Sequence, residues 1–162
     1  MGIDVTQLEN VIIRPSLAAI GLLSDDAVQL MLLTAANESN LGEFLLQKGI
    51  GFGGGIGIYQ MQSMTYNMLW DQVISGNSAL RAKIRLFLGY EGKPVAQRLV
   101  SDLNLASILT RLFYFNIKDP LPKANNIPAM AFYYKRWYNT LLGKATVEEA
   151  EANYRRLCLR SS

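Results

Sequence analysis

Residues 24–61, SDDAVQLMLLTAANESNLGEFLLQKGIGFGGGIGIYQM, decide how the rest of the chain is arranged. Ser24 is a typical N-cap residue, and the helix dipole favours the two aspartates that follow it. The next residues are apolar around nearly the whole circumference of a helix, which predicts a central helix enclosed by other helices. Glu38 comes at its far end. Because an apolar helix delivers this carboxyl to the edge of a core, desolvation should raise its pKa toward neutrality, as a general acid requires.

Glycine is concentrated shortly after this helix: six of the 13 glycines of the chain lie within residues 49–57. Such a run is unfavourable inside a helix or strand because glycine loses the most backbone entropy on folding. The sequence therefore predicts a loop, with at most a small hairpin within residues 49–60, in which backbone approaches another group closely. The run ends in GIYQM (57–61), which places a phenol and an amide beside the glycines.

Apolar residues at helical spacing predict further helices on both sides of this stretch. Pro15 should separate two short helices, since proline cannot continue a helix but suits a first turn. Ser63 and Thr146 are the expected N-cap residues of two later helices, the second with Glu149 in a capping box, and Gly89 is the expected C-cap of a third. The predicted helices cover residues 4–14, 15–23, 63–75, 79–90, 93–103, 105–118, 129–142 and 146–160. With the central helix, this pattern predicts an all-α fold of eight or nine helices with a minor β element at most.

The chain has no histidine, and this absence excludes several classes of hydrolase. Ser-His-Asp and Cys-His hydrolases need an imidazole base, and zinc amidases need histidine ligands. The lone Cys158 makes neither an intrachain disulfide nor a zinc site, so we expect no metal and no cofactor and interpret it as a small apolar residue. Carboxylate chemistry remains, and a carboxylic acid is suited to breaking glycosidic bonds.

A two-carboxylate glycosidase needs a second acid roughly 5–9 Å from the first. Glu43 would lie about 140° away around a continued helix, so it should face elsewhere. After Glu43, no other acid occurs before Asp71. The sequence therefore offers Glu38 no evident partner.

Three motifs resemble the fingerprint of the lysozyme-like lytic transglycosylases that cut peptidoglycan. They are Glu38-Ser39, then Gly57-Ile58-Tyr59-Gln60-Met61, and then Trp137-Tyr138-Asn139. More narrowly, the stretches TAANES.LG, GIYQM...T and YYKRWYNTLLGK.T.EE resemble small transglycosylase-like proteins encoded by bacteriophages and prophages. The chain departs from the family in two places. Tyr59 stands where the family often has an apolar residue, and Thr-Leu-Leu-Gly follows Tyr-Asn in place of a short Ala-Gly.

The resemblance implies a single, mainly α, lysozyme-like domain over residues 1–162. It implies that Glu38 protonates the glycosidic oxygen between N-acetylmuramic acid and N-acetylglucosamine and then acts as the base. The N-acetyl group and the 6-hydroxyl of the substrate would carry out the nucleophilic step, giving a 1,6-anhydromuramoyl product. The implied substrate-binding residues are Ser39, Gly57, Ile58, Tyr59, Gln60, Met61, Tyr138 and Asn139.

Individual roles follow from the same resemblance. Ser39 would lie beside the acid or bind substrate, Gln60 and the backbone near Ile58 would bond acetamido groups, and the Tyr138 hydroxyl would sit near the acid. Tyr59 would offer a platform for a sugar. Several alternatives stay open: Ser39 as an ordinary helix terminus, Met61 as core filler, and the aromatic stripe Phe132, Tyr133 and Trp137 as core rather than a sugar-stacking surface.

The charge is uneven: residues 1–60 carry −4 and residues 61–162 carry +7, within a net charge of +3. A basic second half is compatible with an anionic partner or with solvated helix faces. No apolar run reaches the ~18 residues of a membrane span, and the start lacks the pattern of a signal peptide. We therefore expect a protein of the phage virion or host cytoplasm that is delivered to the periplasm and cell wall by a membrane lesion or a particle.

The expected partners are peptidoglycan glycan strands and other virion or tail proteins. The main rival function is a virion or tail-associated structural protein that retains the fold with weak or no activity, and a lysozyme-like hydrolase is the nearest enzymatic variant. A third alternative, nucleic-acid binding by the basic half, is not favoured by any spacing in the sequence, so we expect no nucleic-acid partner.

Overall fold

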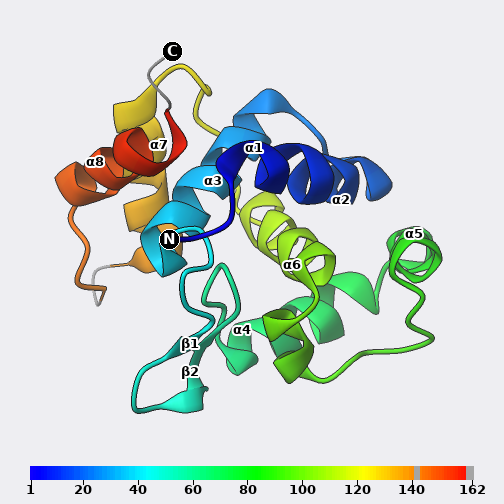
Figure 1. The fold of residues 1–162 in the computed structure, drawn as a ribbon. Helices are drawn as coiled ribbons and strands as arrows, with labels where there is room; N and C mark the ends of the chain where they lie inside the picture. Colours follow the sequence, from blue (N-terminus) through cyan, green and yellow to red (C-terminus); the bar gives the residue numbers. More distant parts are fainter. Residues whose placement is uncertain (141–142, 160–162) are drawn as a thin grey trace.

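Helices dominate the structure, a computed structural model that describes residues 1–140 and 143–159 (Figure 1). This confirms the predicted mainly α class. The elements are, in order, α1 (Val5–Gln7), a π-helical turn (Leu8–Ile13), α2 (Arg14–Ala19), α3 (Asp25–Ser39), β1 (Leu46–Gln47), β2 (Gly51–Ile56), α4 (Ser63–Met68), a π-helical turn (Leu69–Ile74), α5 (Ser78–Leu88), a 3-10 helix (Ala96–Val100), α6 (Leu103–Phe115), α7 (Ile127–Tyr134), a π-helical turn (Lys135–Asn139) and α8 (Val147–Cys158).

Helix α3 is the central element, as the sequence predicts. The Ser24 hydroxyl accepts a hydrogen bond from the N–H of Ala27 over 3.1 Å and so caps its first turn. Ten of the 15 residues of α3 are buried, and the helix packs against α6, α7 and α8. The helix ends at Asn40, whose left-handed backbone turns the chain away directly after Glu38 and Ser39. The acid therefore stands at the last turn of the buried helix.

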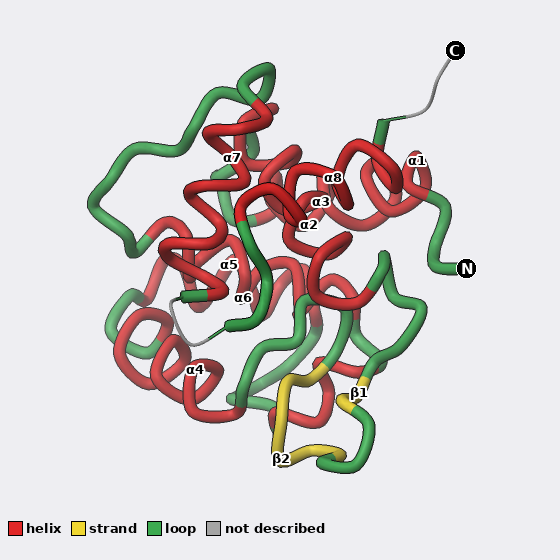
Figure 2. Tube along the Cα trace, turned by 90° about the vertical axis from the view of Figure 1, so that its left-hand side faces the viewer, coloured by secondary structure: helices red, strands yellow, loops and turns green. Residues whose placement is uncertain are grey.

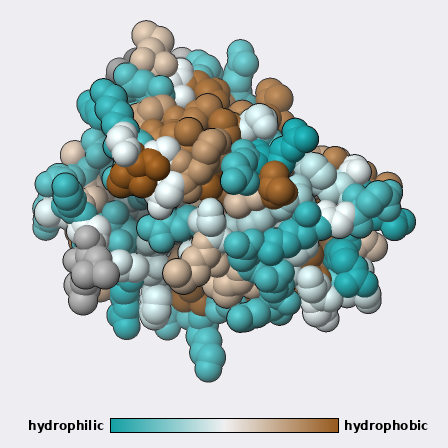
Figure 3. Space-filling view, turned by 90° about the horizontal axis from the view of Figure 1, so that it is seen from below, coloured by the Kyte–Doolittle hydropathy of each residue, from teal (hydrophilic) through white to brown (hydrophobic). Residues whose placement is uncertain are grey.

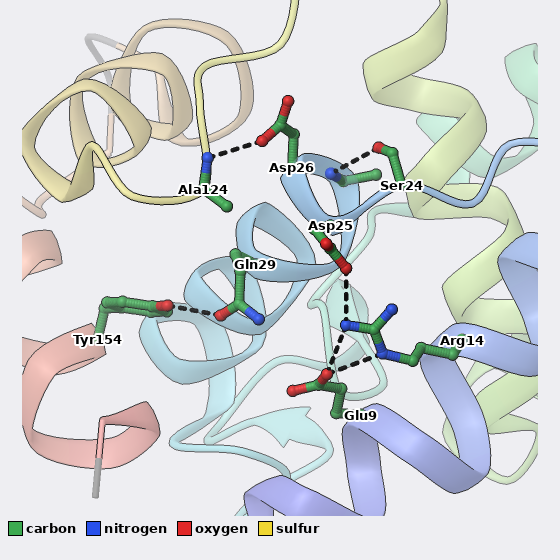
Figure 4. A network of polar contacts seen from close by, with 9 residues as sticks. Glu9, Arg14, Ser24, Asp25, Asp26, Gln29, Ala124 and Tyr154 are labelled. Atoms are coloured by element: carbon green, nitrogen blue, oxygen red, sulfur yellow. Dashed lines mark hydrogen bonds and ion pairs between the residues drawn. The ribbon is translucent and has the colours of Figure 1, made fainter. Parts of the chain in front are cut away.

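Polar contacts hold α3 to elements far away in the sequence (Figure 4). The Arg14 guanidinium donates to Glu9 over 2.8 Å and to Asp25 over 3.0 Å, which joins the N-terminal helices to the start of α3. On another side, the Tyr154 hydroxyl of α8 donates to the Gln29 side chain over 2.6 Å. These contacts fix the direction in which α3 delivers its far end.

The expected break at Pro15 is wrong. The chain stays helical from Val5 to Ala19, and Pro15 lies in the first turn of α2. The N–H of Arg14 bonds the carbonyl of Glu9, five residues back, rather than four. Proline interrupts an α-helix because its ring meets the carbonyl four residues earlier, and the wider π-helical turn before it moves that carbonyl aside.

The predicted helix over residues 93–103 is also wrong, because only a 3-10 helix at Ala96–Val100 forms there. Asp102 ends it: its carboxylate accepts a hydrogen bond from the N–H of Leu105 over 2.8 Å and so begins α6. Ser63 is likewise not an N-cap but the first residue of α4, after Gln62. The expected caps at Gly89 and Thr146 are confirmed by the backbone of Gly89 and by the bond from the N–H of Glu149 to Thr146.

The glycine run forms a small antiparallel hairpin of β1 and β2, in which Leu46 lies opposite Ile56 and Gln47 opposite Gly51. It begins earlier than the predicted residues 49–60 and lies at the lower edge of the molecule (Figures 1 and 2). Phe44, Ile50 and Phe52 around it are exposed. Apolar side chains also gather in one area of the face seen from below (Figure 3).

Within the described residues, no helix combines the length and the apolar character that crossing a membrane requires. Cys158 is half-buried near the end of α8, and burial raises the pKa of its thiol to about 12. A thiol in this state is a poor nucleophile, which agrees with its interpretation as an apolar residue.

Candidate active site

Glu38 faces a pocket of about 540 Å³ between the end of α3, the segment after β2, α4, α6 and the turn Lys135–Asn139. Its lining is mixed, with amide, hydroxyl, carboxyl and aromatic groups. The described lining residues are Glu38, Gln60, Met61, Gln62, Thr65, Phe113, Trp137, Tyr138, Asn139, Thr140 and Gly143. The structure thus brings five of the predicted site residues to one cavity: Glu38, Gln60, Met61, Tyr138 and Asn139.

The Glu38 carboxyl is held by Tyr134, whose hydroxyl donates a hydrogen bond to Oε2. The side-chain amide of Asn139 donates toward the same hydroxyl over 3.5 Å. Burial raises the pKa of Glu38 from 4.5 to about 7, and the hydrogen bonds from Tyr134 and Asn139 oppose part of that rise. The raised pKa agrees with the expectation from the apolar helix. A carboxyl with this pKa can give and take a proton near pH 7.

Lys135 orients the amide of Asn139. Its ammonium donates to Asn139 Oδ1 over 2.8 Å and to the carbonyl of Gly143 over 2.9 Å. Because Oδ1 faces the ammonium, the NH₂ group of Asn139 points toward Tyr134 and Glu38. A Cβ on Gly143 would lie 2.0 Å from Asn139 Oδ1, so a larger residue there would displace the Asn139 amide. The intervening residues 141–142 lie outside the described part of the chain.

Ser39 is fully buried and does not line the pocket. Its hydroxyl donates to the carbonyl of Ile58 over 2.6 Å and accepts from the N–H of Gly42 over 2.8 Å. Ser39 therefore does not lie where it could contact a substrate in the pocket, contrary to the prediction. Ser39 instead ties the end of α3 to the GIYQM segment and so fixes Glu38 relative to Gln60.

Gly57 and Ile58 are buried. Gly57 has a φ of +81°, and its N–H donates to the carbonyl of Leu45 over 2.8 Å. The carbonyl of Ile58 is occupied by Ser39. Neither residue lines the cavity, so the predicted contact of these two residues with substrate is not supported.

The interpretation of Tyr59 as a sugar platform is wrong. Its side chain is 1% exposed, and its hydroxyl forms a hydrogen bond of 2.8 Å with Ser107 of α6. Burial raises the pKa of Tyr59, with the bond to Ser107 opposing the rise. Tyr59 lies in a turn that an isolated bridge between Ile56 and Met61 closes, and the sequence does not reveal this bridge.

Gln60 and Met61, the last two residues of the GIYQM segment, line the pocket. The amide nitrogen of Gln60 donates to the carbonyls of Leu45 over 3.1 Å and of Gly57 over 2.8 Å. Both of its hydrogens are thereby used, which leaves Oε1 as the atom that can accept a hydrogen bond from a ligand. Met61 lines the pocket although it is only 3% exposed, so it serves both as core and as floor.

The tyrosine that contacts the acid is Tyr134, which sequence reasoning missed. The resemblance pointed to Tyr138, one helical turn later, but the Tyr138 hydroxyl donates to the carbonyl of Tyr59 over 2.5 Å. The rings of Tyr134 and Tyr138 stack with centroids 6.0 Å apart. Residues four apart share a helix face, so this spacing was the available clue that both would approach Glu38. Burial and the nearby Glu38 carboxylate raise the pKa of Tyr138.

The aromatic stripe divides between core and surface. Tyr133 is buried and donates to the carbonyl of Asp119, whereas Phe132 is exposed. Trp137 lines the pocket, and the Arg136 guanidinium lies 4.8 Å from the centroid of its ring. Trp137 is therefore the member of the stripe that a ligand in the pocket can contact.

Glu38 is the only acid among the described residues of the lining. Glu43 is exposed and pairs with the N-terminal ammonium over 3.4 Å. Within the same described part of the chain, no group of three or more histidine, cysteine, aspartate or glutamate side chains is arranged to hold a metal ion. The chemistry that this pocket offers is proton transfer by one carboxyl.

Comparison with known proteins finds no matching family model, curated protein or solved structure. The geometry and electrostatics of the pocket are therefore the grounds on which a function can be inferred.

Removal of the Tyr134 hydroxyl is expected to raise the pKa of Glu38 above 7. In Tyr134→Phe, the carboxylate loses the hydrogen bond that stabilises its charged form, while the buried ring is retained. The measurement is an NMR titration of the Glu38 side-chain carboxyl carbon. Tyr133→Phe is the matched control because its hydroxyl bonds Asp119 instead. An unchanged or lower pKa in Tyr134→Phe would contradict the assigned contact.

Proposed function

We propose that this protein is a lysozyme-like peptidoglycan lytic transglycosylase in which Glu38 is the single general acid and base. The observation that carries this proposal is a lone carboxyl with a pKa of about 7, set in a pocket of about 540 Å³ whose other described lining residues are not acidic. A one-carboxylate site fits substrate-assisted cleavage better than a two-carboxylate hydrolysis.

In the proposed reaction, protonated Glu38 gives its proton to the oxygen between N-acetylmuramic acid and N-acetylglucosamine, and the C–O bond breaks. The N-acetyl group of the substrate assists at the anomeric carbon. Glu38, now a carboxylate, takes the proton of the 6-hydroxyl as that oxygen attacks the same carbon, which closes the 1,6-anhydro ring. One proton leaves Glu38 and one returns, so the enzyme ends as it began.

The surrounding groups suit the acetamido substituents of such a substrate. Gln60 Oε1 can accept from an amide N–H, and the Tyr134 hydroxyl keeps Glu38 in place through both steps. Trp137 adds an aromatic side chain to the lining of the pocket. The resemblance to phage and prophage proteins further supports a role in wall degradation during entry or lysis.

Digestion of purified peptidoglycan, followed by mass spectrometry of the released muropeptides, tests the proposal. We expect 1,6-anhydro products, which are lighter by one water than the products of hydrolysis. Reducing ends alone would identify a lysozyme-like hydrolase. No release from intact sacculi or from isolated glycan strands would refute an enzymatic role and favour the virion or tail-associated structural protein.

A further inference from the structure

The π-helical turn that follows α7 lies beside the pocket. In it, the N–H of Thr140 bonds the carbonyl of Lys135, five residues back, over 2.7 Å. Side chains five residues apart lie about 140° apart around an α-helix, whereas a π-helical turn brings them closer together. Tyr134 and Asn139 have this spacing, and the Asn139 amide donates to the Tyr134 hydroxyl over 3.5 Å. The π-helical turn therefore brings an amide to the hydroxyl that holds Glu38.

The half-buried ammonium of Lys135 decides which end of this amide faces the acid. It donates to Asn139 Oδ1 over 2.8 Å and to the carbonyl of Gly143 over 2.9 Å, so both partners are neutral oxygen atoms. An ammonium has donors and no acceptor. With the amide reversed, its NH₂ group would meet the ammonium, and Oδ1 would face the oxygen atoms of Tyr134 and Glu38. Lys135 therefore excludes the reversed orientation.

The titratable groups near Glu38 are three tyrosines, Tyr114 from α6, Tyr134 from α7 and Tyr138 from the π-helical turn. Burial and the nearby Glu38 carboxylate raise the pKa of each, so all three hydroxyls are neutral near pH 7. Among the described residues, no charged side chain contributes to the pKa of Glu38. The hydrogen bonds that favour its carboxylate come from Tyr134 and Asn139. An amide oxygen in the place of the Asn139 NH₂ group would instead repel the negative charge.

We propose that Lys135 is a positioning residue for the acid: its ammonium holds the Asn139 amide in the one orientation that supports the Glu38 carboxylate. Lys135 is not among the described residues that line the pocket, so its effect on Glu38 passes through Asn139. The consequence for catalysis rests on the proposed function, in which Glu38 becomes a carboxylate when the glycosidic bond breaks. The positioning itself is a property of the chain without substrate.

An NMR titration of the Glu38 side-chain carboxyl carbon tests this proposal in the unmodified chain, Lys135→Met, Asn139→Ala and the double variant. Lys135→Met keeps an unbranched apolar stem but removes the ammonium, so the amide is free to turn. The midpoint of the Glu38 titration should rise by about one pH unit in each single variant, because the carboxylate loses a hydrogen bond. The double variant should show no further rise over Asn139→Ala, since Lys135 then has no amide to orient.

Lys144→Met is the matched control, because it removes the same charge from an exposed side chain next to Gly143. It should leave the midpoint of the Glu38 titration within about 0.2 pH units of the unmodified chain. The pH profile of glycan cleavage is a second readout. Its alkaline limb, where Glu38 loses its proton, should move to higher pH in Lys135→Met together with the NMR midpoint. Circular dichroism checks that every variant is folded.

Three results would overturn the proposal. One is an unchanged midpoint in Lys135→Met. Another is a rise on removal of Lys135 that is equally large in the Asn139→Ala background, which would show that Lys135 acts by its charge or through Gly143. The third is a rise of the same size in Lys144→Met. Failure of the proposed function is a separate outcome: if the unmodified chain releases no muropeptides, the NMR titrations still decide whether Lys135 positions the amide.

Discussion

Replacement of Glu38 by glutamine is expected to lower the rate of glycan cleavage by about 10²–10⁴-fold. Glutamine has nearly the same shape, but its amide can neither give a proton to the glycosidic oxygen nor take one from the 6-hydroxyl. No other described residue of the pocket lining is an acid that could substitute for it. The measurement is the initial rate of muropeptide release from purified peptidoglycan near pH 7.

Glu43→Gln is the control for this experiment because it removes an equal charge five residues away, on an exposed side chain that pairs with the N-terminus. It should retain the rate of the unmodified chain. Clearing that persists in Glu38→Gln would remove Glu38 from the mechanism and with it the proposed reaction.

Glu38→Gln is also expected to change how the stability of the protein depends on pH. The pKa of Glu38 is about 7 in the fold and 4.5 in its ordinary state, so between these values the folded chain holds a proton that the unfolded chain has lost. The unfolding free energy therefore falls by about 3 kcal/mol as the pH rises from about 4.5 to about 7. Glu38→Gln should lack this component. Urea unfolding of both chains at pH 4.5 and pH 8 measures it, and parallel pH profiles would show that Glu38 is not desolvated.

Replacement of Gly57 by alanine is expected to destabilise the fold by about 2–5 kcal/mol. The φ of +81° is costly for an L-residue, and the added Cβ would lie 2.3 Å from the carbonyl oxygen of Leu99 in the 3-10 helix. The GIYQM segment and that helix would have to move apart, and Gln60 with them. Thermal and urea unfolding measure the loss.

Gly49→Ala separates the two causes. Gly49 has the same φ of +81°, but nothing lies within 4 Å of a Cβ there. It should lose only about 1 kcal/mol, the cost of the left-handed backbone. Equal losses in the two variants would show that the contact with Leu99 is unimportant.

Local rules predicted much of this structure correctly. Ser24 caps α3, Gly89 ends α5 and Thr146 begins α8, because each of these effects is decided by residues within one turn. The long apolar segment predicted a buried helix, and an acid at its end predicted a raised pKa. The errors at Pro15 and over residues 93–103 arose where a π-helical turn or the cap at Asp102 overrode helical spacing.

The site was predictable in part. Glu38, Gln60 and Tyr138 were found because they belong to compact motifs in the sequence. Tyr134 and Lys135 were not found. The role of Tyr134 depends on Glu38, which lies far away in the chain, and the role of Lys135 depends on the orientation of the Asn139 amide. The prediction that Tyr59 forms a sugar platform is wrong although Tyr59 belongs to the motif. Its hydroxyl is held in the core by Ser107, which lies 48 residues later in the chain.

The sequence by itself determined that α3 is buried and that Glu38 lies in its last turn. It also determined that the glycine-rich run after α3 is not helical and that no imidazole takes part in the chemistry, because composition and short-range periodicity suffice for these conclusions. Only the tertiary structure decided which hydroxyl reaches Glu38, which side of the GIYQM segment faces the pocket and which face of α5 remains in solvent. These depend on how helices pack across long stretches of chain, where a shift of one residue exchanges a buried side chain for an exposed one.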